Sequence, residues 1–353
     1  MTVNGLWSAI ASRCGLPIIN DDVCGKCLAI DTPIWICEAQ TSPSLGRYHS
    51  NPVHFLVYSR CVSLLKNGIE PVFVFEGANS KRTFSTTDRA MLFQQAQSSL
   101  SKLLRSLGVT VVEADGEAEA LCGYLNAAGV CDGVVSNDAD AFLFGAKVLL
   151  VNFGGGDRLE STSHGSGVSD GSNEEERHDT NADAEAQKNQ ARLFNVKNLC
   201  TNATTRNGKT VESVSLSSRD RLITFALLAG SDIGSNKGLA SVGWKKAVEY
   251  IGTLKQTESG IEALRSLGNL NFGEKNHDGD GDALPSTTCC SICRHAGNKK
   301  VHEQNGCSGC GTQPGEKCVP YSNADHIRHI ISEKIGLACR GKKSKFPDER
   351  LIR

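Results

Sequence analysis

Short apolar runs alternate with amphipathic segments over the first 153 residues of the chain. Apolar runs of this length, bounded by glycine and polar residues, are typical of buried strands. They occupy residues 28–36, 71–77, 109–114, 133–138 and 148–153. Between them, residues 54–67 and 117–128 carry Leu, Val and Ala at helical spacing. Strands that alternate with helices predict an α/β fold built on a mostly parallel, doubly wound sheet.

Two polar stretches interrupt this pattern. Residues 154–190 contain almost no large apolar side chain and are rich in Gly, Ser, Asp and Glu, so we interpret them as a disordered acidic insertion. The apolar pattern then resumes, and residues 219–229 predict a helix that ends at Gly230. A second polar stretch, residues 271–288, precedes a cluster of cysteines, and residues 324–353 begin with a helical pattern and end in a basic stretch.

The overall charge is a poor guide to the partners of this chain. Its 38 Lys and Arg residues nearly balance 39 Asp and Glu residues, whereas nucleic-acid-binding proteins usually show a basic excess. The acidic insertion holds nine acidic and three basic residues, a net charge of −6, so the remaining 35 basic and 30 acidic residues carry +5. No apolar run reaches about 18 residues, so no membrane partner is expected.

Carboxylates recur where the predicted strands and helices begin or end. They are Asp31, Glu76, Glu117, Glu119, Asp138, Asp140 and Asp232. Each one alone is explained by a solvated side chain or a helix cap. Several strands that end in a carboxylate would, however, concentrate negative charge at one edge of a parallel sheet, which is costly unless cations neutralise it. Hard divalent ions such as Mg²⁺ take oxygen ligands of this kind, and paired ions promote phosphodiester hydrolysis.

Four stretches carry a specific resemblance. They are MTVNGLW at the start of the sequence, DTPIWICEAQ at 31–40, PVFVFEG at 71–77 and GEAEALCGYLNAAGVCDGVVSNDADAFLFGA at 116–146. Together they resemble the XPG/flap-endonuclease superfamily, and most closely its GEN-like Holliday-junction resolvase branch. Glu76 stands where flap endonucleases carry Asp, and Glu is the GEN-like residue. The resemblance covers most of residues 1–153 and 191–252.

This resemblance implies a metal-dependent, structure-specific DNA endonuclease that acts in the nucleus, in DNA repair and recombination, on Holliday junctions or 5′ flaps. Two Mg²⁺ ions, for which Mn²⁺ substitutes, would be held by the carboxylates. One ion would take Asp31, Glu76, Glu117, Glu119 and Asp138, and the second Asp138, Asp140 and Asp232. Rival interpretations are a flap endonuclease or 5′ exonuclease, a non-catalytic module that binds branched DNA, and an RNA-directed nuclease of PIN type. Dimerisation on a four-way junction stays open.

The resemblance also implies an organisation along the chain. Residues 1–153 would be an N-terminal XPG-type nuclease region and 191–270 an internal XPG-type region with a helix-two-turn-helix element. Residues 271–320 would form a linker and a Cys-rich zinc module, and 321–353 a helical and basic segment. In the last of these, Arg340, Lys342, Lys343 and Lys345 make a weak case for nuclear targeting or DNA contact.

Residues 238–243, GLASVG, resemble the family's G-V-P-G-V-G, which holds a duplex backbone, although a purely structural helical hairpin is the alternative. Ala240 and Ser241 replace the family's Pro and Gly, and we expect Ser241 to cap a helix. The stretch between Glu76 and Glu117 is short. The resemblance implies that a stretch of this length leaves an open gateway suited to branched DNA without free ends. The DNA-contacting residues expected are Lys81, Arg82, Arg89, Gly238, Ser241, Gly243, Lys245 and Lys246, with solvated surface charge as the alternative for the first three.

Fifteen cysteines without a secretory signal favour a reducing compartment and metal binding over disulfides. Two CxxC pairs, Cys290 with Cys293 and Cys307 with Cys310, have the spacing of a structural Zn²⁺ site. His302 is an alternative fourth ligand, and Cys289 and Cys318 are spare thiols. The stretch GNKKVH, 297–302, is similar to one in the Cys-rich insert of plant-type GEN-like nucleases. Cys24 and Cys27 also form a CxxC, but without a second pair nearby we interpret them as ordinary core and surface thiols.

Overall fold

The computed structural model describes residues 3–80, 82, 84, 86–154, 190–202, 204–206, 209–211, 213–231, 233, 237–270, 290, 292, 298–307, 311–318, 323–340 and 352. The chain divides into two compact units, Met1–Leu222 and Ile223–Arg353. The acidic insertion predicted at 154–190 falls almost wholly on residues 155–189, which lie outside the described residues.

The first unit is built on a seven-stranded sheet with the order β1-β7-β6-β5-β2-β3-β4. Its strands are β1 (Gly15–Pro17), β2 (Cys27–Asp31), β3 (Glu70–Phe75), β4 (Thr110–Glu113), β5 (Gly133–Val135), β6 (Val148–Val151) and β7 (Arg192–Asn195). The pairs β6–β5, β5–β2, β2–β3 and β3–β4 are parallel, whereas β7 runs antiparallel to both of its neighbours. The predicted α/β fold with a mostly parallel sheet is therefore confirmed. Val151 pairs with Arg192 across the β6–β7 junction.

Helices and 3-10 turns connect these strands. The α-helices of this unit are α1 (Leu6–Ala9), α2 (Thr32–Thr41), α3 (Pro43–Tyr48), α4 (Pro52–Lys66), α5 (Thr87–Ser106) and α6 (Ala118–Ala127). The 3-10 turns are η1 (Ser12–Cys14), η2 (Asn20–Val23), η3 (Ala139–Phe142) and η4 (Val196–Asn198). A short two-stranded ribbon, β8 (Thr204–Arg206) with β9 (Lys209–Val211), is separate from the main sheet.

One predicted strand was too long. The apolar run 28–36 is a strand only as far as Asp31, and the helix α2 begins at Thr32. Pro33 occupies the first turn of this helix, where its missing N–H and fixed φ suit helix initiation. The run is apolar throughout because Trp35 and Ile36 of the helix are buried in the same core as the strand. A continuous apolar run cannot by itself distinguish a buried strand from a buried helix.

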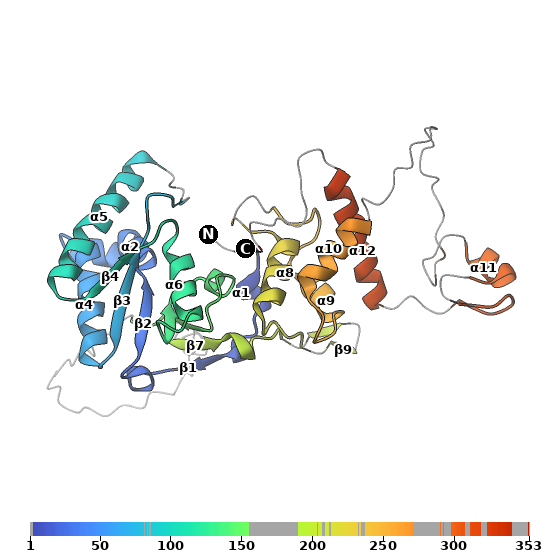
Figure 1. Ribbon diagram of the computed structural model, residues 1–353, viewed down its shortest axis with the longest axis horizontal. Helices are drawn as coiled ribbons and strands as arrows, with labels where there is room; N and C mark the ends of the chain where they lie inside the picture. The colour runs from blue at the N-terminus through green and yellow to red at the C-terminus, as the bar shows by residue number, and fades with distance from the viewer. Residues whose placement is uncertain are drawn as a thin grey trace, which may run out of the picture. The chain divides into compact units, whose positions relative to one another are not determined.

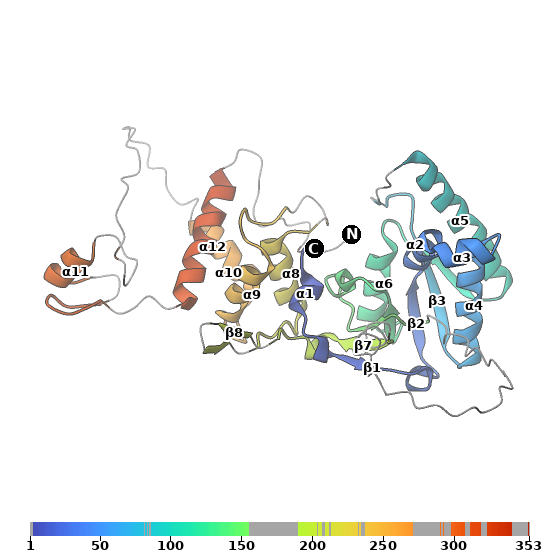
Figure 2. The same ribbon diagram turned by 180° about the vertical axis from the view of Figure 1, so that it is seen from behind.

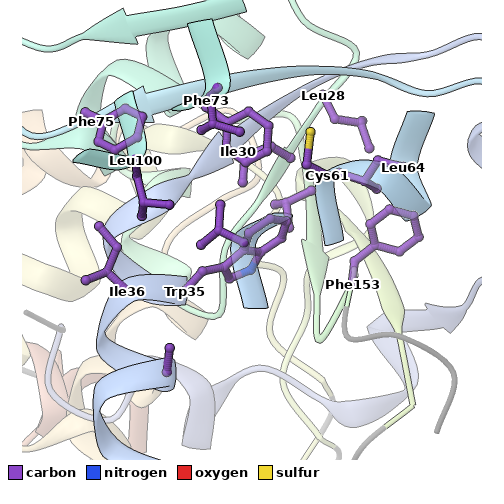
Figure 3. Close-up of a cluster of buried hydrophobic side chains, with 14 of the residues drawn as sticks. Leu28, Ile30, Trp35, Ile36, Cys61, Leu64, Phe73, Phe75, Leu100 and Phe153 are labelled. Carbon is purple, nitrogen blue, oxygen red and sulfur yellow. The ribbon is translucent and has the colours of Figure 1, made fainter. Parts of the chain in front are cut away.

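The main hydrophobic core lies on one face of the sheet, beneath α2, α4 and α5. Side chains that alternate along β2 and β3, such as Ile30 and Phe73, pack against Trp35, Leu64 and Leu100 from these helices (Figure 3). Helix α6 lies on the opposite side of β2 and β3 from α4 and α5 (Figure 1). The central strands β2, β3 and β5 are largely buried, which leaves the edge formed by their carboxyl ends as the place for polar chemistry.

The second unit is helical. The predicted helix 219–229 is confirmed as α8 (Arg219–Ala229), which is followed by α9 (Trp244–Gly252), α10 (Gly260–Leu270), α11 (Lys299–Asn305) and α12 (Asn323–Arg340). Helix α12 packs against both α9 and α10 (Figure 2). Within the described residues, no helix is long and apolar enough to cross a membrane.

Candidate metal centre

Asp31 lies at the carboxyl end of β2 and is the N-cap residue of α2. Its side chain is only 2% exposed. The Ser136 hydroxyl, just beyond β5, donates a hydrogen bond to Asp31 Oδ2 at 3.0 Å and accepts one from the Asp138 amide at 3.1 Å. Among the described residues, Asp31 Oδ1 has no hydrogen-bond partner. Ser136 therefore fixes Asp31 relative to Asp138 and leaves one buried carboxylate oxygen available.

Glu76 follows the last residue of β3 and is held from several directions. Its backbone N–H donates to Gln97 Oε1 of α5 at 3.0 Å. Its carboxylate accepts a hydrogen bond from the Ser80 hydroxyl and, at Oε1, one from Arg82 Nε at 2.5 Å. The Arg82 guanidinium also lies 5.5 Å from the centre of the Phe93 ring. The side chain of Glu76 is thus buried in a pair with an arginine rather than solvated.

The loops that follow β3 and β4 pack directly against each other. The Gly77 amide donates to the Gly116 carbonyl at 2.9 Å, and Asn79 Nδ2 donates to Asp115 Oδ1 at 2.9 Å. A Cβ atom on Gly77 would lie 1.9 Å from the Ala114 carbonyl oxygen, so only glycine fits. This contact places the loop of Glu76 beside the loop that leads to Glu117, the N-cap residue of α6.

Three further carboxylates come from the start of α6 and from η3. Glu119 lies in the first turn of α6, and its buried Oε1 has no hydrogen-bond partner among the described residues. Asp138 caps η3, where its Oδ1 accepts a hydrogen bond from the Asp140 amide at 3.2 Å. Asp140 is 1% exposed, and its Oδ1 accepts a hydrogen bond from the Val3 amide at 2.9 Å. The N-terminal segment is therefore anchored at this cluster, where Trp7 Nε1 also donates to the Asn137 carbonyl at 3.0 Å.

The carboxylates repel one another strongly in this buried setting. Burial raises the pKa of Asp31 to about 7, with further upward contributions from Glu76 and Asp138 and a downward one from Arg82. Burial also raises the pKa of Glu119 well above its ordinary value, and the charges of Asp138, Asp31 and Asp140 add to the shift. A cluster of this kind favours a cation, because positive charge among the carboxylates would restore their ionised forms.

The structure brings together most of the carboxylates that the sequence singled out. Asp31, Glu76, Glu119, Asp138 and Asp140 interact electrostatically with one or more of the others. Glu117 lies at the beginning of α6, and Asp232 lies outside the described residues.

Sequence reasoning did not single out the side chains that position this cluster, Ser80, Gln97 and Ser136. Two of them left a signal in the sequence. Ser136 directly follows the apolar residues of β5, and Gln97, only 6% exposed, occupies a core-facing position of α5. A buried polar residue at a core position usually has a hydrogen-bond partner that requires it.

The structure describes most, but not all, of the residues expected to contact DNA. Lys81 lies outside the described residues, Arg82 pairs with Glu76, and Arg89 is exposed near the start of α5. Lys245 is exposed at the start of α9, and the Lys246 ammonium donates to the Ser241 carbonyl at 2.9 Å.

The prediction that Ser241 caps a helix was wrong. The N-cap residue of α9 is Gly243, and it provides no side-chain cap. Ser241 lies in the preceding turn at φ 64°, a left-handed conformation. Gly238 also has a positive φ, and a Cβ there would lie 2.5 Å from the Gly230 nitrogen. The turn between α8 and α9 is therefore shaped by backbone conformation rather than by a serine cap.

Of the four cysteines expected to bind zinc, Cys290 and Cys307 are buried, and Cys293 and Cys310 lie outside the described residues. Cys290 lies beside His302 and Cys318. Of the other CxxC pair, Cys24 is exposed and Cys27 is partly buried, with its thiol 3.7 Å from the Cys131 sulfur.

Comparison with known proteins is consistent with this site. Residues 1–95 match the XPG N-terminal domain, and residues 108–232 match the XPG I-region. The chain is 27% identical to flap endonuclease GEN homolog 1 of Mus musculus, over 100% of this chain and 36% of the relative. It is 26% identical to flap endonuclease GEN-like 1 of Arabidopsis thaliana, over 82% of this chain and 46% of the relative. The chain thus spans less than half the length of these relatives.

A solved structure of the catalytic core of Rad2 in complex with DNA substrate shares the fold. Its TM-score is 0.50 at 19% sequence identity, over 99% of this chain and 98% of that chain. The two family matches cover the segments that carry all seven carboxylates, from Asp31 to Asp232. The chain belongs to the XPG family.

Proposed function

We propose that this protein is a divalent-metal-dependent, structure-specific DNA endonuclease that hydrolyses phosphodiesters at Holliday junctions or 5′ flaps. The observation that carries the proposal is the buried carboxylate cluster at the carboxyl ends of β2, β3 and β5. The names of the relatives, flap endonuclease GEN homolog 1 and GEN-like 1, support the same activity. The proposed setting is nuclear DNA repair and recombination.

The residues present suit divalent cations. Asp31 Oδ1 and Glu119 Oε1 are buried carboxylate oxygens without a hydrogen-bond donor among the described side chains. Such oxygens are costly to bury and are the ligands that Mg²⁺ and Mn²⁺ prefer. One ion would be held by Asp31, Glu76, Glu117, Glu119 and Asp138, and a second by Asp138, Asp140 and Asp232. When bound, paired cations supply an activated water and stabilise the leaving oxygen of the phosphodiester.

The chain's own side chains orient these ligands. Ser136 links Asp31 to Asp138 through its hydroxyl, and Gln97 holds the backbone at Glu76. Val3 occupies one oxygen of Asp140. Asp31, Glu76 and Asp140 are therefore held by hydrogen bonds with neighbouring elements, which lowers the cost of organising the site when metal and substrate bind.

Recognition of DNA would depend on the backbone rather than on base sequence. The turn at Gly238, Ser241 and Gly243 precedes α9, whose first residues Lys245 and Lys246 carry positive charge. Arg89, with Lys81 and Arg82, would contact phosphates near the scissile bond.

The test compares wild type, Asp138→Asn and Asp21→Asn with Mg²⁺ on labelled four-way junction, 5′-flap and linear duplex DNA. Asp21 is exposed in η2 and serves as the matched control. Wild type and the control should cut branched DNA, whereas Asp138→Asn should not. A wild type that cuts none of the three, or an Asp138→Asn that cuts equally well, would refute the proposal. Paired symmetric nicks in the junction favour a resolvase that acts as a dimer, and cleavage of the flap alone favours a flap endonuclease.

A further inference from the structure

Between Cys290 and Cys318, three buried thiols and a buried imidazole lie together in a small cluster. Cys290, Cys307 and Cys318 pack together with exposures of 0%, 6% and 4%, and only Ile292 adds an apolar contact to them among the described residues. His302 is buried beside them at 4% exposure. Four side chains able to bind metal therefore occupy the place where a larger domain would have Leu, Ile or Phe.

The geometry of three of these side chains fits a shared ion. One ligand atom each from Cys290, His302 and Cys318 lies within 4.8 Å of the others. The Cys318 sulfur lies 3.4 Å from His302 Nδ1. In a tetrahedral zinc site with Zn–S and Zn–N bonds of about 2.3 and 2.0 Å, neighbouring ligand atoms are roughly 3.5 Å apart. The observed separation of the Cys–His pair already matches that spacing.

The backbone around α11 explains how these residues meet. Asn298 caps the helix by accepting a hydrogen bond from the Val301 amide at 2.9 Å, and His302 lies one residue further along. The helix ends at Gly306, whose φ of 77° lets the chain reverse direction.

After this reversal the chain folds back along α11. The Cys307 amide donates to the Thr312 carbonyl at 2.8 Å, and the Gly315 amide donates to the Glu303 carbonyl at 2.7 Å. The segment that follows α11 is thus held against the helix, which returns Cys318 to His302.

A metal is the physical reason for such an interior. A short segment has little apolar surface to bury, and an interior of thiols and an imidazole offers the ligand atoms that Zn²⁺ prefers. A structural Zn²⁺ supplies the missing folding free energy when three or four Cys and His ligands close around it.

We propose that the chain binds one structural zinc ion through Cys290, His302 and Cys318. This set differs from the two CxxC pairs that spacing alone suggests. Cys307 is buried in the same cluster, but its sulfur is not among the three ligand atoms that lie within 4.8 Å of one another. The site lies wholly within residues 290–318, so its metal content can be measured without reference to DNA cleavage.

The test measures zinc per chain by mass spectrometry in the whole protein, purified in reducing buffer. Wild type should hold about one zinc. Cys318→Ser and His302→Gln should lose it, whereas Cys24→Ser, at an exposed thiol outside the cluster, should keep it as the matched control. A wild type without zinc, or Cys318→Ser and His302→Gln variants that hold as much zinc as Cys24→Ser, would overturn the proposed ligand set.

A second measurement guards against variants that lose metal merely by misfolding. Cobalt replaces zinc in such sites, and its sulfur-to-metal absorption reports the number of thiolate ligands. The His302→Cys variant should retain cobalt and show a stronger absorption per ion than wild type, because a further thiolate joins Cys290 and Cys318 in the site. Cobalt bound by His302→Cys with unchanged thiolate absorption would contradict a role for His302 as ligand.

Discussion

The Arg82 guanidinium lies 2.5 Å from Glu76 Oε1, and its positive charge also acts on Asp31. It opposes the upward shift of the Asp31 pKa as well as pairing with Glu76. Arg82 therefore neutralises part of the negative charge that a bound cation would otherwise neutralise. A divalent ion that binds Glu76 must share that carboxylate with Arg82.

This relationship predicts the effect of removing Arg82. Because the side chain of Glu76 is only 3% exposed, Arg82→Ala should lower the free energy of unfolding of the metal-free protein by about 1–2 kcal/mol. In Arg82→Ala, Mg²⁺ should raise the free energy of unfolding by more than it does in wild type, because the ion relieves the repulsion among the carboxylates that Arg82 no longer offsets. Urea unfolding with EDTA or with Mg²⁺ measures both effects.

Arg105→Ala is the matched control for that experiment. Arg105 pairs with Glu113 at 3.4 Å, but both side chains are more than half exposed. An exposed pair contributes little, so this variant should change the free energy of unfolding by less than about 0.5 kcal/mol. Equal losses from the two arginine variants would show that the Arg82–Glu76 pair has no special role.

The raised pKa of Asp31 predicts a pH dependence of the metal-free protein. The folded state binds a proton at Asp31 up to about pH 7, whereas the unfolded chain releases it near its ordinary pKa of 3.8. The folded state thus holds more protons within that window, so its stability falls as pH rises through it. With EDTA present, the loss of stability between about pH 5 and pH 8 should be smaller in Asp31→Asn than in wild type. Identical pH profiles would contradict the buried position of this carboxylate.

Gly77 is predicted to tolerate no side chain. Its added Cβ would lie 1.9 Å from the Ala114 carbonyl, a backbone atom that cannot move without separating the two strand-end loops. We expect Gly77→Ala to lower the free energy of unfolding by about 3 kcal/mol. Gly116→Ala is the control, because its Cβ would meet nothing closer than the Asn79 carbonyl at 3.9 Å. Thermal unfolding of both variants decides the matter, and a Gly77→Ala as stable as Gly116→Ala would refute the predicted clash.

Ser241 holds a left-handed backbone that glycine adopts without strain. The conformation costs a non-glycine residue roughly 1–2 kcal/mol. Glycine relieves this strain in the folded state, but its greater flexibility also stabilises the unfolded chain and offsets part of the gain. Ser241→Gly should therefore stabilise the protein by about 0.5–1 kcal/mol. The neighbouring Ala240 has no positive φ, so Ala240→Gly should be destabilising instead. Chemical denaturation measures the free energy of unfolding of both variants. A change in the same direction for both would contradict this account.

The sequence predicted the five parallel strands of the sheet, though not β1 and β7, and singled out most of the clustered carboxylates, because these features depend on local signals. The apolar run before Glu76 and the two valines before Ser136 mark strands whose parallel ends must meet at one edge. The polar-rich helix α5 was not predicted, although Phe93, Ala96, Leu100 and Leu104 repeat along it at helical spacing and are buried.

Other features depend on contacts between distant parts of the chain, which no local pattern encodes. Ser136 reaches Asp31 across 105 positions, and the Val3 amide reaches Asp140 across 137. The pairing of Arg82 with Glu76 is closer in sequence but arises from the turn at Gly77, which a pattern of residue types does not specify. In the Cys-rich segment, the regular CxxC spacing does not indicate Cys318, an isolated cysteine whose sulfur lies 3.4 Å from His302 Nδ1.

The antiparallel pairing of Val151 with Arg192 fixes the two ends of the acidic insertion side by side at adjacent strands. The entropy of closing a loop grows slowly with its length, by about 0.6 kcal/mol for each doubling. Length and composition between these strands can therefore drift during evolution at almost no cost to the sheet. For the experimenter, the same junction is a permissive location at which a fluorophore, an affinity tag or a degradation signal can be introduced into the chain.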